Sequence, residues 1–344
     1  MIRIGIVGIG FMGFTHFEAA KKLKGARVTA IATRDEKKLS GDWTGIQGNF
    51  GPRGGHVDTR KLKTYRDYRE LLADPDIDLV DICLPTDMHE KVALAAIRAG
   101  KATLVEKPIA IDLKAANRIV SAAKKAGTLL MVGQVLPYFP EFRFVHQCIV
   151  SGKYGKLLAA HFRRVISPPK WSKEMTDYRR LGGWGIDLHI HDNHFISLVC
   201  GIPKQVFSQG IVQDGLVNHV HTQYVYDDPG LAVSCVSGGI AAEQLQFAHG
   251  FEIYLERATI LYNAGTLGGG WVVDRPLTLV TSRGKPTTPS LKGGTEWCAA
   301  FTAELQDAVD AVRTGREPPM LSGELARDAL QLCYAEARSI ASRK

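Results

Sequence analysis

Short apolar runs alternate with amphipathic segments from the start of the chain to about residue 134. The runs lie at Ile2–Val7, Val28–Ala32, Ile77–Leu84, Ala102–Val105 and Leu129–Val132. Between them, apolar positions recur at helical spacing, in the segments Met12–Lys24, Tyr68–Ala73, His89–Ala99 and Leu113–Ala126. This alternation predicts βαβ units, and runs with few polar residues predict a parallel sheet that helices cover on both faces.

Polar residues and glycines mark the expected ends of these helices. Asp87 and Glu90 have the spacing of an N-cap and an N3 residue, and Asp112 precedes the fourth helix. Glycines stand where helices should stop, at Gly25, Gly100 and Gly127.

The texture of the chain changes after Gln134. A helix is predicted at Glu141–Val150, and long strand-like runs follow at Leu157–Ile166, Gln205–Val212, His219–Tyr226, Leu231–Val236, Phe251–Tyr262 and Trp271–Val280. Turn residues such as those of 227–230 separate the runs, so consecutive strands should pair antiparallel. Further helices are predicted at Gly185–Val199, Trp297–Arg313 and Leu325–Ser342.

These patterns predict two domains. Residues 1–134 should form an α/β Rossmann domain that binds a dinucleotide. Residues 135–344 should form an α+β domain with an open, mainly antiparallel sheet, a role in substrate binding and oligomerisation, and the C-terminal helices.

Composition excludes several classes of protein. The chain has 344 residues, of which 45% are hydrophobic and 23% charged, as is typical of soluble globular proteins. The net charge of +8 comes from scattered Lys and Arg, so neither a nucleic-acid partner nor a membrane surface is expected. The 6 cysteines form no C-x-x-C pair, which favours reduced thiols in the cytoplasm. We expect no export signal, and the sequence contains no apolar stretch of about eighteen residues.

A glycine pattern follows the first strand and opens the first helix. Gly8-x-Gly10-x-x-Gly13, with Phe11 and Met12 inside it, has the context that a dinucleotide fingerprint requires. The glycines allow a tight turn and close approach of the backbone to a pyrophosphate, and the helix N-terminus attracts the anion.

The residues after the second strand bear on the choice of cofactor. NAD-selective proteins place an acid here for the ribose hydroxyls, whereas this chain has Thr33 and Arg34. A guanidinium suits the 2′-phosphate of NADP, which is the first choice. Asp35 follows directly and keeps NAD as the alternative.

The pattern lapses between Ser40 and Lys63, where the chain is rich in glycine and carries Trp43 and Phe50. A long segment without secondary structure in a compact domain is usually functional or mobile. Its position after the second strand predicts a place near the adenosine half of the cofactor, and a plain surface insertion is the alternative.

Two further groups of residues carry candidate chemistry. Lys107, in the triplet Glu106-Lys107-Pro108, ends an apolar run, and a lysine at the carboxyl end of a parallel strand points into the crevice where ligands bind. The segment 182–194 is dense in titratable residues. If it is one helix, Asp187, His191 and His194 share a face, and Asp187 can orient His191 as a general base.

Other interpretations of this cluster stay open. Histidines and aspartates at helical spacing could hold zinc, although no H-E-x-x-H motif and no cysteine pair supplies further ligands. A purely structural histidine is the other alternative. We expect no metal.

The fingerprint, the segment 84–89, the triplet 106–108 and the segment 187–194 together resemble the glucose-fructose oxidoreductase, inositol dehydrogenase and MocA (Gfo/Idh/MocA) family. Its members carry T-P-x-x-x-H, E-K-P and D-x-G-x-H-x-x-D at the last three places. Asp187 and His191 match the final motif, whereas His189 replaces its glycine and His194 its last acid, a place that Asp192 could fill in a different register.

The resemblance implies roles for individual residues. Lys107, Asp187 and His191 would be catalytic: His191, oriented by Asp187, takes the proton of a substrate hydroxyl, and Lys107 hydrogen-bonds the same oxygen. Cofactor contacts are implied for Gly8, Gly10, Phe11, Met12, Gly13, Thr33, Arg34, Leu84, Pro85, Thr86, His89, Glu106, Lys107 and Gln134. Substrate contacts are expected at Tyr138, Arg163, Lys170, Trp171, Trp184, His189 and His194, with core packing as the alternative for Trp184.

The implied function is hydride transfer between NADP or NAD and a secondary alcohol or ketone of a sugar, cyclitol or glycoside. One alternative is a nicotinamide-dependent glycoside hydrolase or lyase that works through transient oxidation. Another is a nucleotide-binding regulator without chemistry, against which the intact Lys107, Asp187 and His191 speak. Analogy with the family implies a homodimer or homotetramer.

Overall fold

The computed structural model describes residues 1–168, 182–294 and 296–343. The chain divides into two compact units. The first consists of Met1–Tyr138 and Gly293–Arg327, and the second of Phe139–Lys292 and Asp328–Lys344. The segment that contains the predicted helix at 297–313 thus belongs with the Rossmann unit, whereas the sequence pattern placed it in the second domain.

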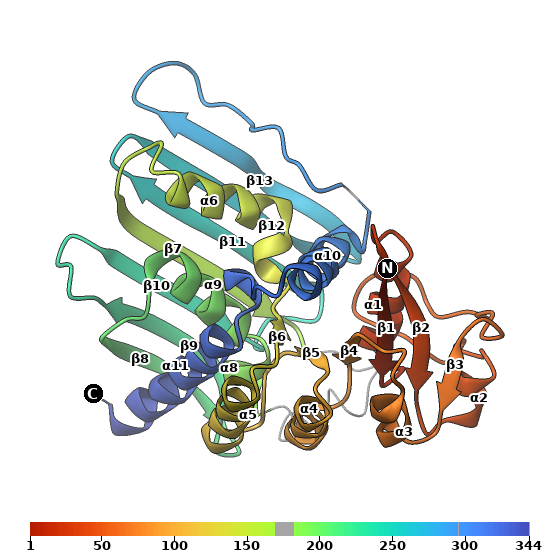
Figure 1. Cartoon of the computed structure of the whole chain (residues 1–344). Helices are drawn as coiled ribbons and strands as arrows, with labels where there is room; N and C mark the ends of the chain where they lie inside the picture. Colours follow the sequence, from red (N-terminus) through yellow and green to blue (C-terminus); the bar gives the residue numbers. More distant parts are fainter. Residues whose placement is uncertain (169–181, 295, 344) are drawn as a thin grey trace. The chain divides into compact units, whose positions relative to one another are not determined.

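The first unit is built on a 6-stranded parallel sheet with the order β3-β2-β1-β4-β5-β6 (Figure 1). Its strands are β1 (Ile2–Val7), β2 (Ala26–Ala32), β3 (Lys63–Tyr65), β4 (Leu79–Ile82), β5 (Ala102–Glu106) and β6 (Leu130–Gly133). The predicted Rossmann fold is therefore confirmed. Strand β3 was missed, because it is short and its residues are mostly exposed, so no apolar run marks it.

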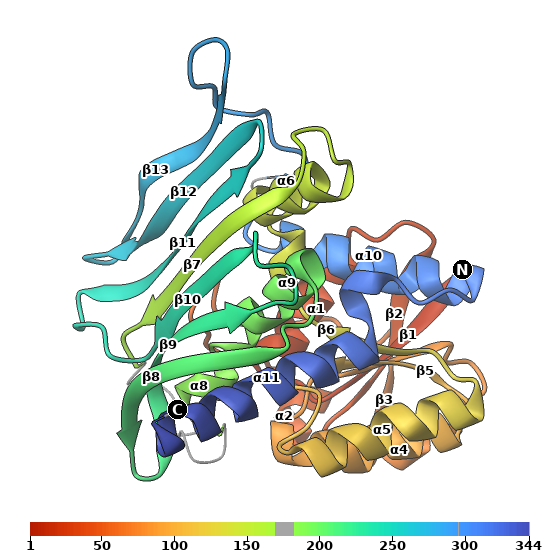
Figure 2. The same ribbon diagram turned by 90° about the vertical axis from the view of Figure 1, so that its left-hand side faces the viewer.

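Helices cover both faces of this sheet. α4 (His89–Arg98) packs beside α5 (Leu113–Ala126), and α1 (Phe11–Ala20) packs beside α10 (Ala299–Thr314), as Figure 2 shows. Shorter elements are α2 (Glu36–Leu39), α3 (Tyr68–Ala73), η1 (Thr86–Met88), η2 (Leu136–Tyr138) and η3 (Pro319–Leu321). Asp112 caps α5 as expected, and Gly127 ends it in the left-handed conformation.

The predicted N-cap of α4 is wrong, although the helix begins at His89 as predicted. The chain makes a 3-10 turn over Thr86–Met88, so the N-cap of α4 is Met88, without a side-chain hydrogen bond, and not Asp87. Asp87 and Glu90 have the spacing of a cap, but the 3-10 turn after Pro85 includes Asp87, so the N-cap lies one residue later, at Met88.

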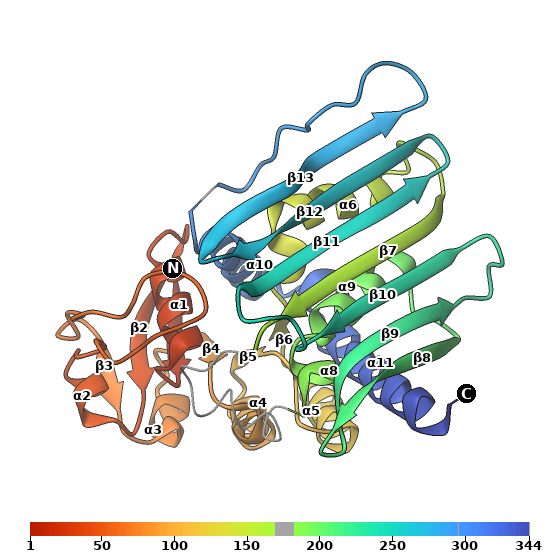
Figure 3. The ribbon, with the colours of Figure 1, turned by 180° about the vertical axis from the view of Figure 1, so that it is seen from behind.

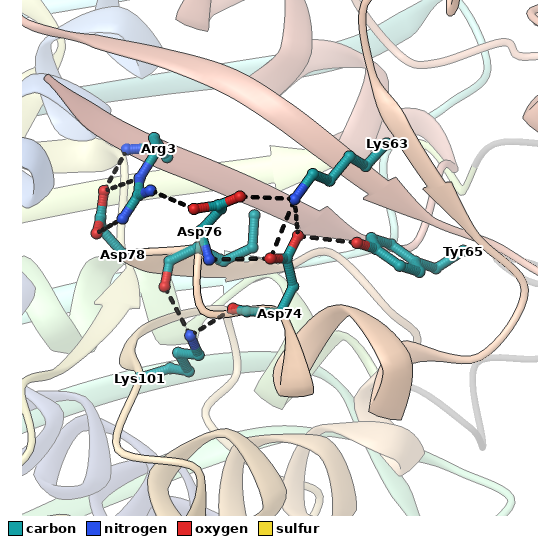
Figure 4. Close-up of polar contacts among 8 residues, drawn as sticks. Arg3, Lys63, Tyr65, Asp74, Asp76, Asp78 and Lys101 are labelled. Atoms are coloured by element: carbon teal, nitrogen blue, oxygen red, sulfur yellow. Dashed lines mark hydrogen bonds and ion pairs between the residues drawn. The ribbon is translucent and has the colours of Figure 1, made fainter.

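A network of charges ties the amino ends of the strands together (Figure 4). The guanidinium of Arg3 in β1 binds Asp78 at 2.9 Å and Asp76 at 2.8 Å, and Lys63 in β3 reaches Asp74 at 2.9 Å. Burial raises the pKa of Asp74, but Lys63 and further hydrogen bonds outweigh it and hold that pKa near about 2. Ligands of such sheets bind at the carboxyl ends of the strands, so this network serves the fold.

The glycine-rich segment contributes to the core of the first unit. Trp43 is fully buried, its ring centroid lies 4.8 Å from that of Phe17, and its Nε1 donates to the carbonyl of Lys38 at 2.8 Å. Phe50 stacks on Phe301 with a centroid distance of 5.5 Å. The segment is therefore more than a plain surface insertion.

The second unit is built on a 7-stranded sheet with the order β13-β12-β11-β7-β10-β9-β8. Only the pair of β7 and β10 is parallel among the pairs of these strands that the structure describes. The strands are β7 (Leu157–Ile166), β8 (Gln205–Gln213), β9 (Leu216–Val225), β10 (Ala232–Gly238), β11 (Leu245–Leu255), β12 (Ala258–Leu267) and β13 (Gly270–Thr281). The predicted single strand at 251–262 is wrong, because a turn at Glu256 and Arg257 splits it into β11 and β12.

Helices pack on one face of this sheet, and the other face is open, as Figures 2 and 3 show. The helices are α6 (Pro140–Val150), α8 (Trp184–Asp187), α9 (Ile190–Cys200) and α11 (Gly323–Ser342). Residues of β7 alternate accordingly: Phe162 and Arg164 are buried, whereas His161 and Arg163 are exposed. Among the described residues, no helix is long and apolar enough to cross a membrane.

We expect Trp43→Ala to destabilise the protein by about 3–5 kcal/mol, because the substitution leaves a large cavity in the core. Chemical denaturation followed by circular dichroism measures this loss. Ile202→Ala is the control, since Ile202 is 50% exposed and its truncation should cost less than about 0.5 kcal/mol. Equal losses in both variants would contradict a core role for the glycine-rich segment.

Candidate active site

The glycine turn between β1 and α1 has the geometry of a phosphate cradle. Gly8 adopts a φ of +98°, and a Cβ at Gly13 would lie 2.0 Å from the carbonyl oxygen of Gly8. A Cβ at Gly10 would meet nothing within 4 Å, so the turn faces open space there. Gly10 is also the N-cap of α1 and supplies no side-chain hydrogen bond to its first turn. The free N–H groups at this helix N-terminus fit a pyrophosphate.

The residues after β2 differ in how far they are engaged. Asp35 is the N-cap of α2, and its carboxylate accepts hydrogen bonds from the backbone N–H groups of Lys37 at 3.0 Å and Lys38 at 3.4 Å. Arg34 is exposed, and its guanidinium has no hydrogen bond or ion pair within the described ranges. The acid that would bind ribose hydroxyls is thus occupied, while the cation beside it is accessible.

His89 links two segments at the carboxyl edge of the sheet. Its Nδ1 lies 2.8 Å from the carbonyl oxygen of Pro108, and its Nε2 lies 2.8 Å from that of Leu84. Burial lowers the pKa of His89, and a neutral ring donates to only one of these carbonyls at a time. Both nitrogens face the backbone, so the expected direct contact of His89 with the cofactor is not what the structure shows.

The triplet 106–108 follows the same edge. Lys107 is half-buried at the end of β5, at the edge where ligands of such sheets bind. Glu106 is buried, and its Oε2 accepts the backbone N–H of Lys107 at 3.0 Å. The carboxylate of Glu106 is therefore directed at its own chain, which argues against the cofactor contact expected for it.

A buried cluster of titratable groups includes Glu106. Nδ1 of His16 in α1 lies 2.9 Å from Oδ2 of Asp81 and 3.5 Å from Sγ of Cys83. Nε2 of His16 lies 3.1 Å from Oε1 of Glu106, a contact of charges without hydrogen-bond geometry. The carboxyl oxygens of Glu304 in α10 are buried and, within the described ranges, have no hydrogen-bond partner.

Gln134, which was expected to contact the cofactor, lies at the end of β6 and is fully buried. Neither its amide oxygen nor its amide nitrogen has a hydrogen-bond partner among the described residues. A buried amide without partners is costly, so a ligand that hydrogen-bonds Gln134 would relieve this cost.

Asp187 and His191 lie on two short helices of the second unit. The predicted single helix is wrong, because α8 ends at Asp187 and α9 begins at Ile190, with a turn at Leu188 and His189. Asp187 and His191 are both partly accessible, whereas the residues between them and after them are buried. An accessible imidazole and carboxylate in an otherwise buried stretch are a candidate acid–base site.

His189 lies in the core, so the substrate contact expected for it is not what the structure shows. It is fully buried, and its Nε2 lies 2.9 Å from Oε1 of Glu336 in α11. Asn193 donates to the other oxygen of Glu336 at 2.7 Å, and the hydroxyl of Tyr224 donates to Asn193 at 2.6 Å. Burial lowers the pKa of His189, but Glu336 outweighs it and raises that pKa. This network joins α9 to α11 and β9.

Two neighbours of His191 are also buried. Asp192 accepts from Nε of Arg164 at 2.9 Å, so its carboxylate balances a buried guanidinium and does not replace the missing acid of the motif. His194 is fully buried, and burial lowers its pKa to about 3, so the ring is neutral. Neither ring nitrogen of His194 has a hydrogen-bond partner among the described residues.

Three residues expected to bind substrate lie elsewhere. Arg163 is on the open face of the sheet and donates to Asn263 at 2.5 Å, opposite the face where Arg164 meets α9. Tyr138 is buried and donates to Asp307 of α10 at 3.0 Å. Trp184 is buried against Ile166 and Leu188, which confirms the alternative of core packing. Lys170 and Trp171 fall outside the described residues.

Sequence reasoning missed His16, Glu304 and Glu336. A signal was present, because each is a titratable residue in the buried stripe of a helix. Glu304 lies between Phe301 and Leu305 in the buried residues of α10, and Glu336 follows Cys333 by one helical turn. A charged residue at such a position needs a buried partner.

Comparisons with known proteins agree with this geometry. Residues 2–134 match the family model GFO_IDH_MocA, described as an oxidoreductase family with an NAD-binding Rossmann fold. The chain is 26% identical to myo-inositol 2-dehydrogenase of Thermotoga maritima, over 100% of this chain and 97% of that protein. It is 33% identical to the inositol 2-dehydrogenase/D-chiro-inositol 3-dehydrogenase of Lactiplantibacillus plantarum, over 45% of this chain and 42% of that one.

A solved structure shares the fold over the whole chain. It is an NAD-binding oxidoreductase from Klebsiella pneumoniae, with a TM-score of 0.82 and 22% identity, over 100% of this chain and 98% of that one. The glycine cradle, the triplet at the end of β5 and the match of residues 2–134 lead to one conclusion: the first 134 residues contain the NAD-binding Rossmann fold of the Gfo/Idh/MocA oxidoreductase family.

Proposed function

We propose that this protein is an NADP-dependent dehydrogenase or reductase that acts on a secondary alcohol, or the matching ketone, of a cyclitol or sugar. The observation that carries the proposal is that the glycine cradle and Lys107 share the carboxyl edge of one parallel sheet. The inositol dehydrogenases among the relatives support a polyol as the class of substrate.

The first unit offers a complete set of groups for a dinucleotide. The N-terminus of α1, with Phe11 and Met12 in its first turn, would bind the pyrophosphate. Thr33 and Arg34 would receive the adenosine ribose, and Leu84, Pro85, Thr86 and Gln134 would face its nicotinamide half. The nicotinamide, when bound, supplies the hydride acceptor or donor.

Arg34 supports NADP over NAD. Its guanidinium is accessible for paired, charge-assisted hydrogen bonds with a 2′-phosphate. Asp35, which would favour NAD, is engaged in capping α2. NAD remains the alternative because the carboxylate could exchange the cap for a ribose.

Lys107, Asp187 and His191 would carry the chemistry on the substrate. His191 removes the proton of the reacting hydroxyl, and Asp187 holds the imidazole in the tautomer that can accept it. Lys107 donates a hydrogen bond to the same oxygen as negative charge develops on it. In reduction the same groups return the proton to the carbonyl oxygen.

His194 is the remaining candidate for a substrate contact within the described ranges. Its neutral, buried ring has two nitrogens without partners among the described residues, and one substrate hydroxyl could donate to the unprotonated nitrogen while another accepts from the N–H. Lys170 and Trp171 stay proposals of the same kind.

A second copy of this chain would fit the open face of the second sheet. Phe207 and Ile211 of β8 are 46% and 50% exposed on that face. Apolar side chains on an uncovered sheet favour association, so we propose a homodimer or a homotetramer.

We expect Lys107→Ala and His191→Ala to fold and to bind cofactor, yet to lose turnover by about a hundredfold or more. Each substitution removes transition-state stabilisation and little ground-state binding. A panel of inositols and sugars with each nicotinamide, followed by the absorbance of the reduced cofactor, measures turnover. Lys114→Ala on the exposed side of α5 is the control and should be unaffected. Near-normal turnover in either active-site variant would refute the assignment.

We expect Arg34→Ala to weaken NADP binding by about 1.5–3 kcal/mol, the range for charge-assisted hydrogen bonds, and to leave NAD binding almost unchanged. Titration calorimetry with each cofactor gives both values. Arg27→Ala is the matched control, because Arg27 is exposed near the other end of β2. An equal loss for NADP and NAD would show that Arg34 does not recognise the phosphate.

A further inference from the structure

His16 stands between two carboxylates in the core of the first unit. It lies in the second turn of α1, and its ring is fully buried. Asp81 of β4 accepts from one ring nitrogen at 2.9 Å, and Glu106 of β5 lies 3.1 Å from the other. The imidazole thus bridges the carboxyl ends of adjacent strands.

Glu106 links His16 to Lys107. One oxygen of the Glu106 carboxylate faces His16, and the other accepts the backbone N–H of Lys107 at 3.0 Å. Glycine at position 133 leaves room for this carboxylate, since a Cβ there would lie only 3.1 Å from Oε1. A change at His16 would therefore reach the backbone of Lys107 through one side chain.

The charge of the cluster favours a protonated His16. Burial lowers the pKa of His16, but the carboxylate of Asp81 outweighs it and keeps that pKa well above 6.5. Burial raises the pKa of Glu304 well above 4.5, and the neighbouring Glu106 and Asp81 raise it further against the opposing effect of His16. Within the cluster, protonation is therefore favoured at both His16 and Glu304.

A metal ion is a poorer account of these residues. His16, Asp81 and Cys83 offer ligand atoms within 4.8 Å of one another. However, the 2.9 Å separation of His16 and Asp81 is that of a hydrogen bond. Burial also raises the pKa of the Cys83 thiol, which therefore stays protonated rather than becoming the thiolate that binds metals.

We propose that His16 is a positioning residue for Lys107: anchored by Asp81, its ring contacts the Glu106 carboxylate, and Glu106 holds the backbone from which the Lys107 side chain extends. The proposal deepens the proposed function, on which it rests, because it assigns the placement of Lys107 to a residue on α1. His16 itself would touch neither substrate nor cofactor.

The protonation of Glu304 gives a pH dependence of stability. A carboxyl with a raised pKa in the fold binds its proton more tightly there than in the unfolded chain, so stability falls as pH rises from about 4.5 through the raised value. The imidazolium of His16 adds a loss of stability above about pH 6.5 in the same way.

We expect the Tm of the native chain to fall as the pH rises from about 5 to about 9. The Tm of Glu304→Gln should fall less steeply, and the difference between the two slopes should be about 2–4 °C per pH unit. The amide keeps the size of the group and removes its titration. Glu324→Gln is the control, because Glu324 is exposed on α11 and its removal should leave the slope unchanged. Identical slopes in native chain and Glu304→Gln would show that Glu304 is ionised in the fold.

A pair of amide variants tests the positioning role. The amide of His16→Asn can take the place of Nδ1 and keep the bond to Asp81, whereas the longer amide of His16→Gln can take the place of Nε2 and face Glu106. Because a displacement of about 1 Å at a catalytic group can cost up to about a hundredfold, we expect His16→Asn to lose about tenfold or more in kcat. His16→Gln should stay within about threefold of the native kcat. Both variants should keep the KM for the cofactor.

A second measurement needs no substrate. Reductive methylation with carbon-13 labels the lysines, and Lys107→Arg identifies the resonance of Lys107. This resonance should shift in His16→Asn and stay near its native position in His16→Gln. Equal kcat and equal resonances in the two variants would overturn the proposal, as would a metal found in the purified protein at one per chain. If no substrate is turned over but the resonance shifts as expected, the proposed function fails and the positioning role stands.

Discussion

The first unit depends on the close approach of α1 to the end of β1. Only glycine at position 13 permits it, since a Cβ there would lie 2.0 Å from the carbonyl oxygen of Gly8. The approach brings the free N–H groups of the helix to the carboxyl edge of the sheet. It also carries His16, one turn further along α1, to within contact of β4 and β5. Ligand binding and the buried charge cluster thus both depend on the absence of a side chain at Gly13.

Periodicity predicted the regular elements well because burial dictates it. The strands of the parallel sheet have few polar residues, and α3 and α5 agree with their predicted bounds. Errors occur where local geometry overrides the pattern. A tight turn at Glu256 and Arg257 interrupts a run that looked like one strand, and the turn at Leu188 breaks a helix that spacing alone made continuous. The pattern also could not show which unit α10 joins, because its apolar stripe fits either.

The site was predictable in part for a similar reason. Motifs identified the glycine turn and the end of β5, where the backbone itself determines the geometry. The polar residues around His191 were harder, because neighbours in sequence point in different directions on a helix. His189 and Asp192 turn inward, where a buried charge requires a partner that lies far away in sequence, Glu336 and Arg164. One sequence does not reveal such partners.

The place of α10 has a consequence for synthesis of the chain. The first unit includes residues 293–327, which follow the whole sheet of the second unit in sequence. On the ribosome, α1 therefore emerges long before the helix that packs on it, and His16 before Glu304. The face of α1 that packs on α10 therefore stays uncovered until the strands of the second sheet have been synthesised. Synthesis of the nucleotide-binding unit thus begins before that of the second unit, but it ends only after most of the second unit has been made.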